Sequence, residues 1–281
     1  MIRFFISVFI LISYPLHTLA VDVDIPHVSL KAKDSFQFDY LYANKHRAFT
    51  IAPGGAWSWT ANKATEEEAK KVALDACNSY TEQKCVLYAV NDKITFDKDQ
   101  WFKLWGPYKT KADVKTSKQG IKVGEIFPDV TFTNPEGLKQ SISDLKGKLV
   151  FAHFWGCWCP PCRREFETLI DMYRILQDTM GDQVAFVVLQ LREPIETSRN
   201  WAKQNNLDTL PLSDSGVKDS EDKFIRIKGG KQIADREIAK YFPSSYVIDK
   251  NGYVIFSHMG SIENWPEYVN FFRDAVENSG K

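Results

Sequence analysis

The chain has 281 residues, enough for one large domain or two ordinary ones. Hydrophobic residues make up 44% of it, and 36 basic residues balance 36 acidic ones, so the formal net charge is zero. The sequence also has no block of five or more like charges, so nothing suggests the basic surface of a nucleic-acid-binding protein or a polybasic membrane patch, and we expect no nucleic-acid partner.

The first twenty residues have the pattern of a targeting segment. Arg3 supplies a positive charge, residues 4–12 are almost wholly apolar, and Thr18-Leu19-Ala20 places small residues where signal peptidase cleaves. An uncleaved membrane anchor is the alternative, but a bilayer crossing takes about 20 apolar residues and this run is shorter. We therefore expect a signal peptide over residues 1–20, cleaved after about Ala20, and export to the periplasm.

Residues 21–108 are expected to form a small α/β domain. A short strand over 47–51 ends at a Pro-Gly-Gly turn, and a second strand follows at 86–90. Between them, Thr65 and Glu68 form a capping box that opens a helix with one apolar face. The order of elements is strand, helix, strand.

Two of the five cysteines lie in this first domain. Cys77 falls at the end of the expected helix and Cys85 at the start of the next strand. In an exported protein we expect them to pair, although two unpaired thiols are the alternative. The closed loop is short, so the disulfide would contribute about 2–3 kcal/mol to stability.

A polar, lysine-rich linker over residues 109–122 leads to a second domain over residues 123–281. Apolar runs at 149–155 and 184–191 suit buried strands, and helical patterns follow at 166–176 and 195–205. A hairpin around the turn at 249–252 and a last helix near 268–276 complete an α/β plan.

The other three cysteines crowd the segment between the first buried strand and its helix. Cys159 and Cys162 are separated by two residues, which lets them bond and part with little backbone movement. At a helix start the first sulfur is favoured as a thiolate, and the second is placed to resolve a mixed disulfide. A structural zinc site needs more ligands than this pair supplies. A purely structural disulfide across two residues would constrain very little of the chain. The spacing predicts thiol–disulfide exchange.

Three motifs then point to one family. The stretch Phe154-Trp-Gly-Cys-Trp-Cys-Pro-Pro-Cys-Arg-Arg-Glu165 resembles the active-site segment of the thioredoxin superfamily, and its Pro-Pro pair resembles the exported TlpA/ResA-like branch. Residues 124–128 resemble that branch's first strand, and 243–252 resemble its proline segment and hairpin. The resemblance covers about 155 residues from Val123. It implies a thioredoxin-like C-terminal domain beside a small disulfide-pinned N-terminal one.

The resemblance also implies roles. Cys159 would be the nucleophile and Cys162 the resolving thiol, with Pro243 as a cis-proline beside them and Trp155 and Trp158 as flanking aromatics. The expected partners are the thiols and disulfides of other proteins and a membrane electron donor. No cofactor is expected.

Three features depart from the branch. His153 stands where thioredoxin has a buried acid, and it is either a proton relay for Cys162 or a hydrogen-bonded core residue, the reading we favour. Cys157 stands where threonine or serine is usual, and we expect an inward, non-catalytic thiol rather than a third reactive sulfur. The segment from Leu212 to Asp235 is longer than usual, and we expect a solvated surface insertion rather than a partner site.

The direction of electron flow is expected to be reductive. Pro160 and Pro161 remove two amide donors from the helix start, which should leave the thiolate less stabilised and the couple more reducing. Arg163 and Arg164 act weakly in the opposite direction. An oxidase or isomerase role stays open.

The rival class is a copper carrier on the same scaffold. Cys157, Cys159 and Cys162 could hold Cu(I), which prefers thiolates, with His258 as a fourth ligand. Fold alone does not separate the two classes. We favour the oxidoreductase and expect no metal.

Overall fold

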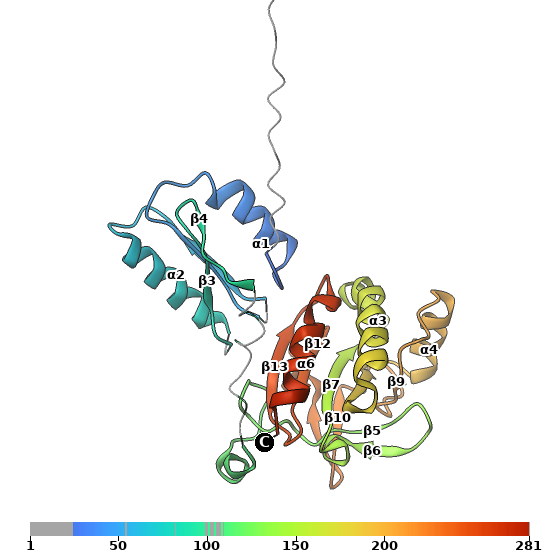
Figure 1. The fold of residues 1–281 in the computed structure, drawn as a ribbon. Helices are drawn as coiled ribbons and strands as arrows, with labels where there is room; N and C mark the ends of the chain where they lie inside the picture. Colours follow the sequence, from blue (N-terminus) through green and yellow to red (C-terminus); the bar gives the residue numbers. More distant parts are fainter. Residues whose placement is uncertain are drawn as a thin grey trace, which may run out of the picture.

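A computed structural model describes residues 25–280 apart from 54, 82, 99–100, 102–103, 105–107 and 109. The expected signal peptide lies outside these residues. The described chain forms an N-terminal domain around a four-stranded sheet and a C-terminal domain around a five-stranded sheet (Figure 1). Of the helices in this part of the chain, none combines the length and apolar character of a membrane span.

The N-terminal domain is a small α/β unit, as expected. Its sheet has the order β2-β1-β3-β4, and its core is rich in aromatic side chains. Thr65 caps the long helix by accepting a hydrogen bond from the Glu68 amide at 3.1 Å. The elements are α1 (Leu30–Asp34), the π-helical η1 (Ser35–Tyr40), β1 (Ala48–Ile51), β2 (Trp57–Thr60), α2 (Glu66–Tyr80), β3 (Val86–Val90) and β4 (Lys93–Ile94).

The predicted Cys77–Cys85 disulfide is present. It joins the last turn of α2 to the residue before β3, and both cysteines are buried beside Ala52. The cross-link lies in the N-terminal domain, away from the second group of cysteines, so its role is structural.

The linker region and the C-terminal domain carry the remaining elements. They are η3 (Lys111–Thr116), β5 (Thr131–Thr133), β6 (Lys139–Ser141), η4 (Ile142–Leu145), β7 (Leu149–Trp155), α3 (Pro160–Met180), η5 (Gly181–Gln183), β8 (Val184–Gln190), α4 (Ile195–Gln204), β9 (Leu212–Ser213), β10 (Phe224–Ile227), β11 (Lys231–Ala234), α5 (Asp235–Ile238), β12 (Ser244–Ile248), β13 (Val254–Met259), η6 (Trp265–Tyr268) and α6 (Val269–Asn278). The expected strands and helices are found, but α3 begins six residues before and ends four residues after the predicted 166–176.

The central sheet has the order β13-β12-β7-β8-β9. Strands β7, β8 and β9 are parallel, whereas β12 runs antiparallel to β7 and to β13. Odd-numbered residues of β7 pack in the core that includes α3 and α6, and even-numbered ones pack in a second core on the other face. This is the thioredoxin-like α/β plan that the resemblance implies, and that prediction is confirmed.

Three expectations need correction or refinement. Residues 124–128 make only isolated β-bridges, through Ile126, instead of a strand. The linker region contains the 3₁₀ helix η3. The segment Leu212–Asp235 is no solvated loop: it folds into the β10–β11 hairpin and buries Val217 and Ile225, because both side chains fill the core on that face of the sheet.

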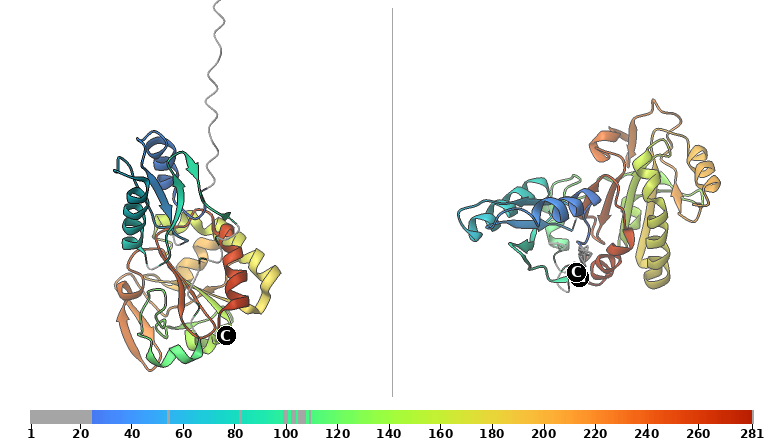
Figure 2. Two further views of the ribbon diagram at one scale, coloured as in Figure 1. Left: turned by 60° about the vertical axis from the view of Figure 1, so that its left-hand side comes forward. Right: turned by 90° about the horizontal axis from the view of Figure 1, so that it is seen from above.

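The two domains meet at the β13 edge of the central sheet. The His27 ring stacks on Tyr268 at a centroid distance of 4.0 Å, and the Tyr268 hydroxyl donates to the Pro53 carbonyl at 3.3 Å. The His27 amide donates to the Glu267 carboxylate at 3.1 Å. Figure 2 shows the two domains side by side in an elongated molecule.

Candidate active site

The candidate site lies where β7 passes into α3. Cys159 is the N-cap residue of α3, and Cys162 lies in its first turn. The two are joined as a disulfide, with Cα atoms 5.3 Å apart. Cys159 is 3% exposed and Cys162 is fully buried. The structure thus brings together the two sulfurs that the sequence predicted as a pair.

The local sequence limits what stabilises the Cys159 sulfur. Pro160 and Pro161 carry no N–H, so Cys162 is the first residue of the helix with an amide to donate. That amide donates to Cys159 Sγ at 3.2 Å. A Cys159 thiolate would therefore receive less help from the helix start than at a helix without prolines.

Pro243 lies at the same end of the sheet. Strand β12 begins one residue later, with Ser244 opposite Phe154 of β7. The Phe242–Pro243 peptide bond is cis, as the resemblance implies. The Phe242 ring packs against the core that contains both cysteines and lies 5.0 Å from the Trp158 ring, edge to face.

Trp158 is folded back over the loop that precedes the dithiol. Its indole N–H donates to the Leu191 carbonyl at 2.9 Å, and the side chain is 42% exposed. A Cβ atom on Gly156 would lie 2.2 Å from the Trp158 Nε1, so only glycine admits this arrangement. Trp158 and Phe242 together form an aromatic border beside the disulfide.

His153 is fully buried on β7 and faces α3. Its Nδ1 lies 2.9 Å from the Ser245 hydroxyl, and its Nε2 lies 3.4 Å from Oε1 of Glu165. Burial lowers the His153 pKa to about 3, so the imidazole is neutral at pH 7. It is a core residue with polar partners, and it contacts an acid.

That acid, Glu165, was missed in the sequence. It lies three residues after Cys162, hence on the same face of α3. Its Oε2 accepts hydrogen bonds from the Ile262 amide at 2.8 Å and from the Trp265 indole at 3.1 Å. Burial raises its pKa to about 8, so it holds a proton at neutral pH. A charged residue on an otherwise apolar helix face was the available signal.

Cys157 is half-buried and is held by a second acid that the sequence did not indicate, Glu193. The Cys157 amide donates to Oε1 of Glu193 at 2.7 Å, and its thiol donates to Oε2 at 2.9 Å. Burial, aided by the hydrogen bond to Glu193 and its charge, raises the Cys157 pKa to about 12. The thiol is therefore protonated at pH 7.

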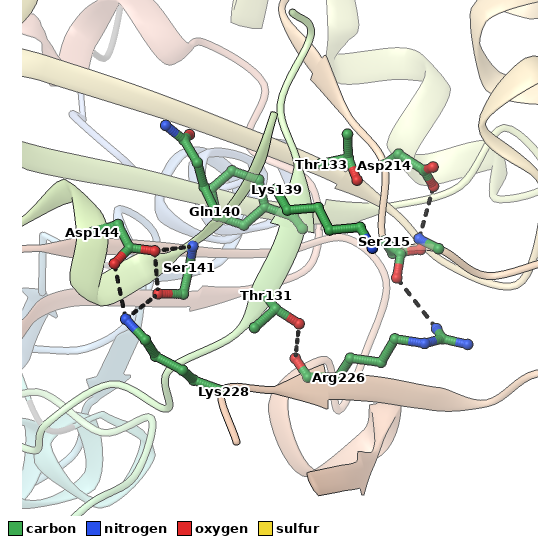
Figure 3. A pocket seen from close by; sticks show the side chains of 12 residues that line it. Thr131, Thr133, Lys139, Gln140, Ser141, Asp144, Asp214, Ser215, Arg226 and Lys228 are labelled. Carbon is green, nitrogen blue, oxygen red and sulfur yellow. Dashed lines mark hydrogen bonds and ion pairs between the residues drawn. The ribbon is translucent and has the colours of Figure 1, made fainter. Parts of the chain in front are cut away.

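A pocket of about 500 Å³ lies between the β5–β6 hairpin and β10, and Figure 3 shows its polar lining. Its Lys228 is paired with Asp144 at 2.8 Å. Asp214 of this pocket accepts from Gln190 at the end of β8 at 3.1 Å. This hydrogen bond joins the Leu212–Asp235 segment to the end of β8, where Gln190 lies opposite Trp155 of β7.

The copper alternative receives no added support. In the described ranges no group of three or more His, Cys, Asp or Glu residues is arranged to hold a metal ion. His258 lies on β13, opposite Ser245 of β12.

Comparison with known proteins gives a family match. A family model described as Redoxin matches residues 122–270, just over half of the chain. The match includes β7, α3, β12 and both cysteines of the candidate site.

Curated relatives agree with this match. The thiol-disulfide oxidoreductase ResA of Geobacillus thermodenitrificans is 31% identical over 147 residues, which are 52% of this chain and 75% of the relative. The thioredoxin-like protein YneN of Bacillus subtilis is 29% identical over 161 residues, 56% of this chain and 82% of the relative. The crystal structure of StoA from Bacillus subtilis covers 53% of this chain and 98% of its own, with 22% identity and a TM-score of 0.38.

Proposed function

This chain belongs to the redoxin family and is a thiol–disulfide oxidoreductase, and from that premise we propose that it is exported and reduces disulfides of other proteins through Cys159 and Cys162. The observation that carries the proposal is the Cys159–Cys162 disulfide at the start of α3, beside the cis Phe242–Pro243 bond. A pair with this placement can open and close while the rest of the fold stays fixed.

The proposed reaction starts from the reduced form. The Cys159 thiolate attacks one sulfur of the substrate disulfide, the substrate S–S bond breaks, and its other sulfur leaves as a thiolate. Cys162 then loses its proton and attacks Cys159 Sγ. The second substrate sulfur leaves, so two electrons pass to the substrate and the Cys159–Cys162 disulfide forms.

Glu165 supplies the proton acceptor for the second step. It lies one turn from Cys162, in a buried position where water has little access. As a carboxylate it takes the Cys162 proton when Cys162 attacks, and it returns a proton when the disulfide is reduced again. The disulfide form described here is thus the state in which Glu165 carries a proton, and its raised pKa fits that state.

The reducing direction is supported by the helix start. Fewer amide donors at Cys159 make the thiolate less stable, and a less stable reduced form means a more reducing couple. The two prolines of the Cys159–Cys162 segment have this effect.

Export is supported by two observations. The apolar N-terminal run has the pattern of a signal peptide, and the Cys77–Cys85 disulfide is of a kind that persists in oxidising compartments. A reductant in such a compartment needs a supply of electrons, so we expect a membrane electron donor to restore the dithiol.

An assay run in both directions tests the proposal. The pre-reduced full chain should reduce a disulfide-containing protein substrate, and its own Cys159–Cys162 bond should form in equal amount. The disulfide form should oxidise a reduced protein substrate much more slowly. Fast net oxidation with no detectable reduction would mean an oxidase.

A further inference from the structure

The segment that follows β8 holds the redox loop, residues 155–158, at several points. The Leu191 amide donates to the Trp155 carbonyl at 2.8 Å, and the Leu191 carbonyl accepts from the Trp158 indole at 2.9 Å. Glu193 takes up both donors of Cys157. Every residue of the loop except Gly156 is therefore hydrogen-bonded to this one segment.

Glu193 has the pattern of a buried, fixed carboxylate. It is 6% exposed and accepts three hydrogen bonds, from the Cys157 amide, the Cys157 thiol and the Ser198 hydroxyl, the last at 2.5 Å. Three donors directed at two oxygens suit an ionised acceptor. The Glu193 carboxylate is thus held against Cys157, which precedes Cys159 by two residues in the sequence.

Arg192, which lies between Leu191 and Glu193 in the sequence, adds a second restraint on the redox loop. It has a φ of 61°, which is unusual for a residue with a side chain. Its guanidinium pairs with buried Asp235 at 2.6 and 3.0 Å and lies 5.2 Å from the Phe242 ring centre. Asp235 ends the Leu212–Asp235 segment, so this segment helps to fix the direction in which Glu193 points.

We propose that Glu193 is a positioning residue of the redox centre, which fixes the loop through Cys157 and makes the Cys159–Cys162 couple more reducing. The inference rests on the proposed function of that dithiol. Its physical basis is charge: a Cys159 thiolate exists only in the reduced form, and a fixed carboxylate held on the adjoining loop at Cys157 destabilises that thiolate. The uncharged disulfide does not meet this repulsion.

This role also explains the third cysteine. The Cys157 thiol acts as a hydrogen-bond donor to Glu193, and a serine or threonine hydroxyl can do the same. Cys157 then takes no part in electron transfer. The rival account makes Cys157 a third reactive sulfur, with Glu193 as the base that activates it.

The test compares the exchange equilibrium of four single variants with glutathione, using the full chain. Glu193→Gln should shift the equilibrium about tenfold toward the dithiol, which is a rise of about 30 mV. Ser198→Ala removes a donor that partly offsets the charge, so it should shift the equilibrium the other way, by about twofold. Cys157→Ser and the matched control Glu196→Gln, an exposed acid on α4, should leave the equilibrium unchanged.

A double variant separates the two accounts. In the Cys157→Ser background, Glu193→Gln should keep its full shift, because the charge acts on Cys159. If the shift disappears there, Glu193 acts by activating Cys157 and the proposal is wrong. If Glu193→Gln does not fold, an unchanged equilibrium in Ser198→Ala overturns the proposal. If the parent chain fails to exchange with glutathione at all, the proposed function itself fails.

Discussion

Replacing Cys159 with serine is expected to abolish the reduction of protein disulfides. The hydroxyl of serine is not a usable nucleophile toward a disulfide sulfur at neutral pH, because exchange requires a thiolate. Cys162 cannot take over the attack, because it is fully buried below Cys159. Activity in the reductive assay should fall to the background of buffer, while the unfolding transition should change little.

Cys162→Ser should give the complementary result. Cys159 can still attack a substrate, but no second thiol releases the product, so a mixed disulfide through Cys159 should accumulate. Peptide mapping by mass spectrometry identifies the linked cysteine. Cys157→Ser is the matched control and should retain turnover within about two-fold, since its thiol is protonated and bonded to Glu193. Full activity in Cys159→Ser, or a substrate linked to Cys157, would show that the mechanism is wrong.

Glu165→Gln should slow turnover by about a hundredfold, the lower end of what a positioned proton acceptor contributes. Glutamine can still accept from the Ile262 amide and the Trp265 indole, so the packing around position 165 should survive. The loss should be confined to the step in which Cys162 attacks the mixed disulfide. Stopped-flow kinetics with an excess of substrate should therefore show a normal first step and a slow second one.

The Glu165→Gln substitution should also change how the free energy of unfolding depends on pH. The Glu165 pKa rises from an ordinary value of 4.5 to about 8 on folding, so the native state binds more protons than the unfolded state between these values. Its contribution is fully present below about pH 4.5 and is lost as the pH rises toward 8. His153, Trp265 and the Ile262 amide are its polar neighbours.

Urea unfolding of the disulfide form at a series of pH values measures this effect. The parent should lose stability between pH 5 and pH 8 with a steeper slope than Glu165→Gln, in which the group cannot titrate. Asp171→Asn, an exposed acid on α3, is the control and should follow the parent. Parallel curves for the parent and Glu165→Gln would mean that Glu165 is ionised in the native state.

Periodicity and motif spacing predicted most of the C-terminal fold. The bounds of β7 were predicted without error, because a strand buried on both faces is a continuous apolar run. The cysteine pair was predicted from its spacing directly after such a strand, and the cis-proline was implied by the family resemblance. Local patterns of this kind need no knowledge of distant contacts.

The two acids of the site could not be found in this way. Glu165 meets His153 only because α3 packs on β7, and Glu193 meets Cys157 only because β8 lies beside β7. Such contacts depend on how helices and strands pack against one another, and the hydrophobic pattern of a sequence does not determine that packing. His153 stands where thioredoxin has a buried acid, and the fold supplies an acid, Glu165, from the facing helix.

The segment from Leu212 to Asp235 shows the same limit. Its polar sequence and paired glycines favoured a solvated loop, yet Ile225 is buried and Asp235 pairs with Arg192 beside the dithiol. A single buried side chain in the β10–β11 hairpin gives too weak a pattern to distinguish a packed hairpin from a loop. The sequence pattern therefore does not reveal that Asp235 of this segment restrains the redox loop through Arg192.

The midpoint potential of the Cys159–Cys162 couple in the full chain tests the central claim most directly. Equilibration with glutathione and dithiothreitol buffers, followed by thiol trapping and mass spectrometry, measures it without a substrate. A reductase should have a midpoint near that of thioredoxin, about −270 mV. A midpoint near that of the oxidant DsbA, about −120 mV, would contradict it.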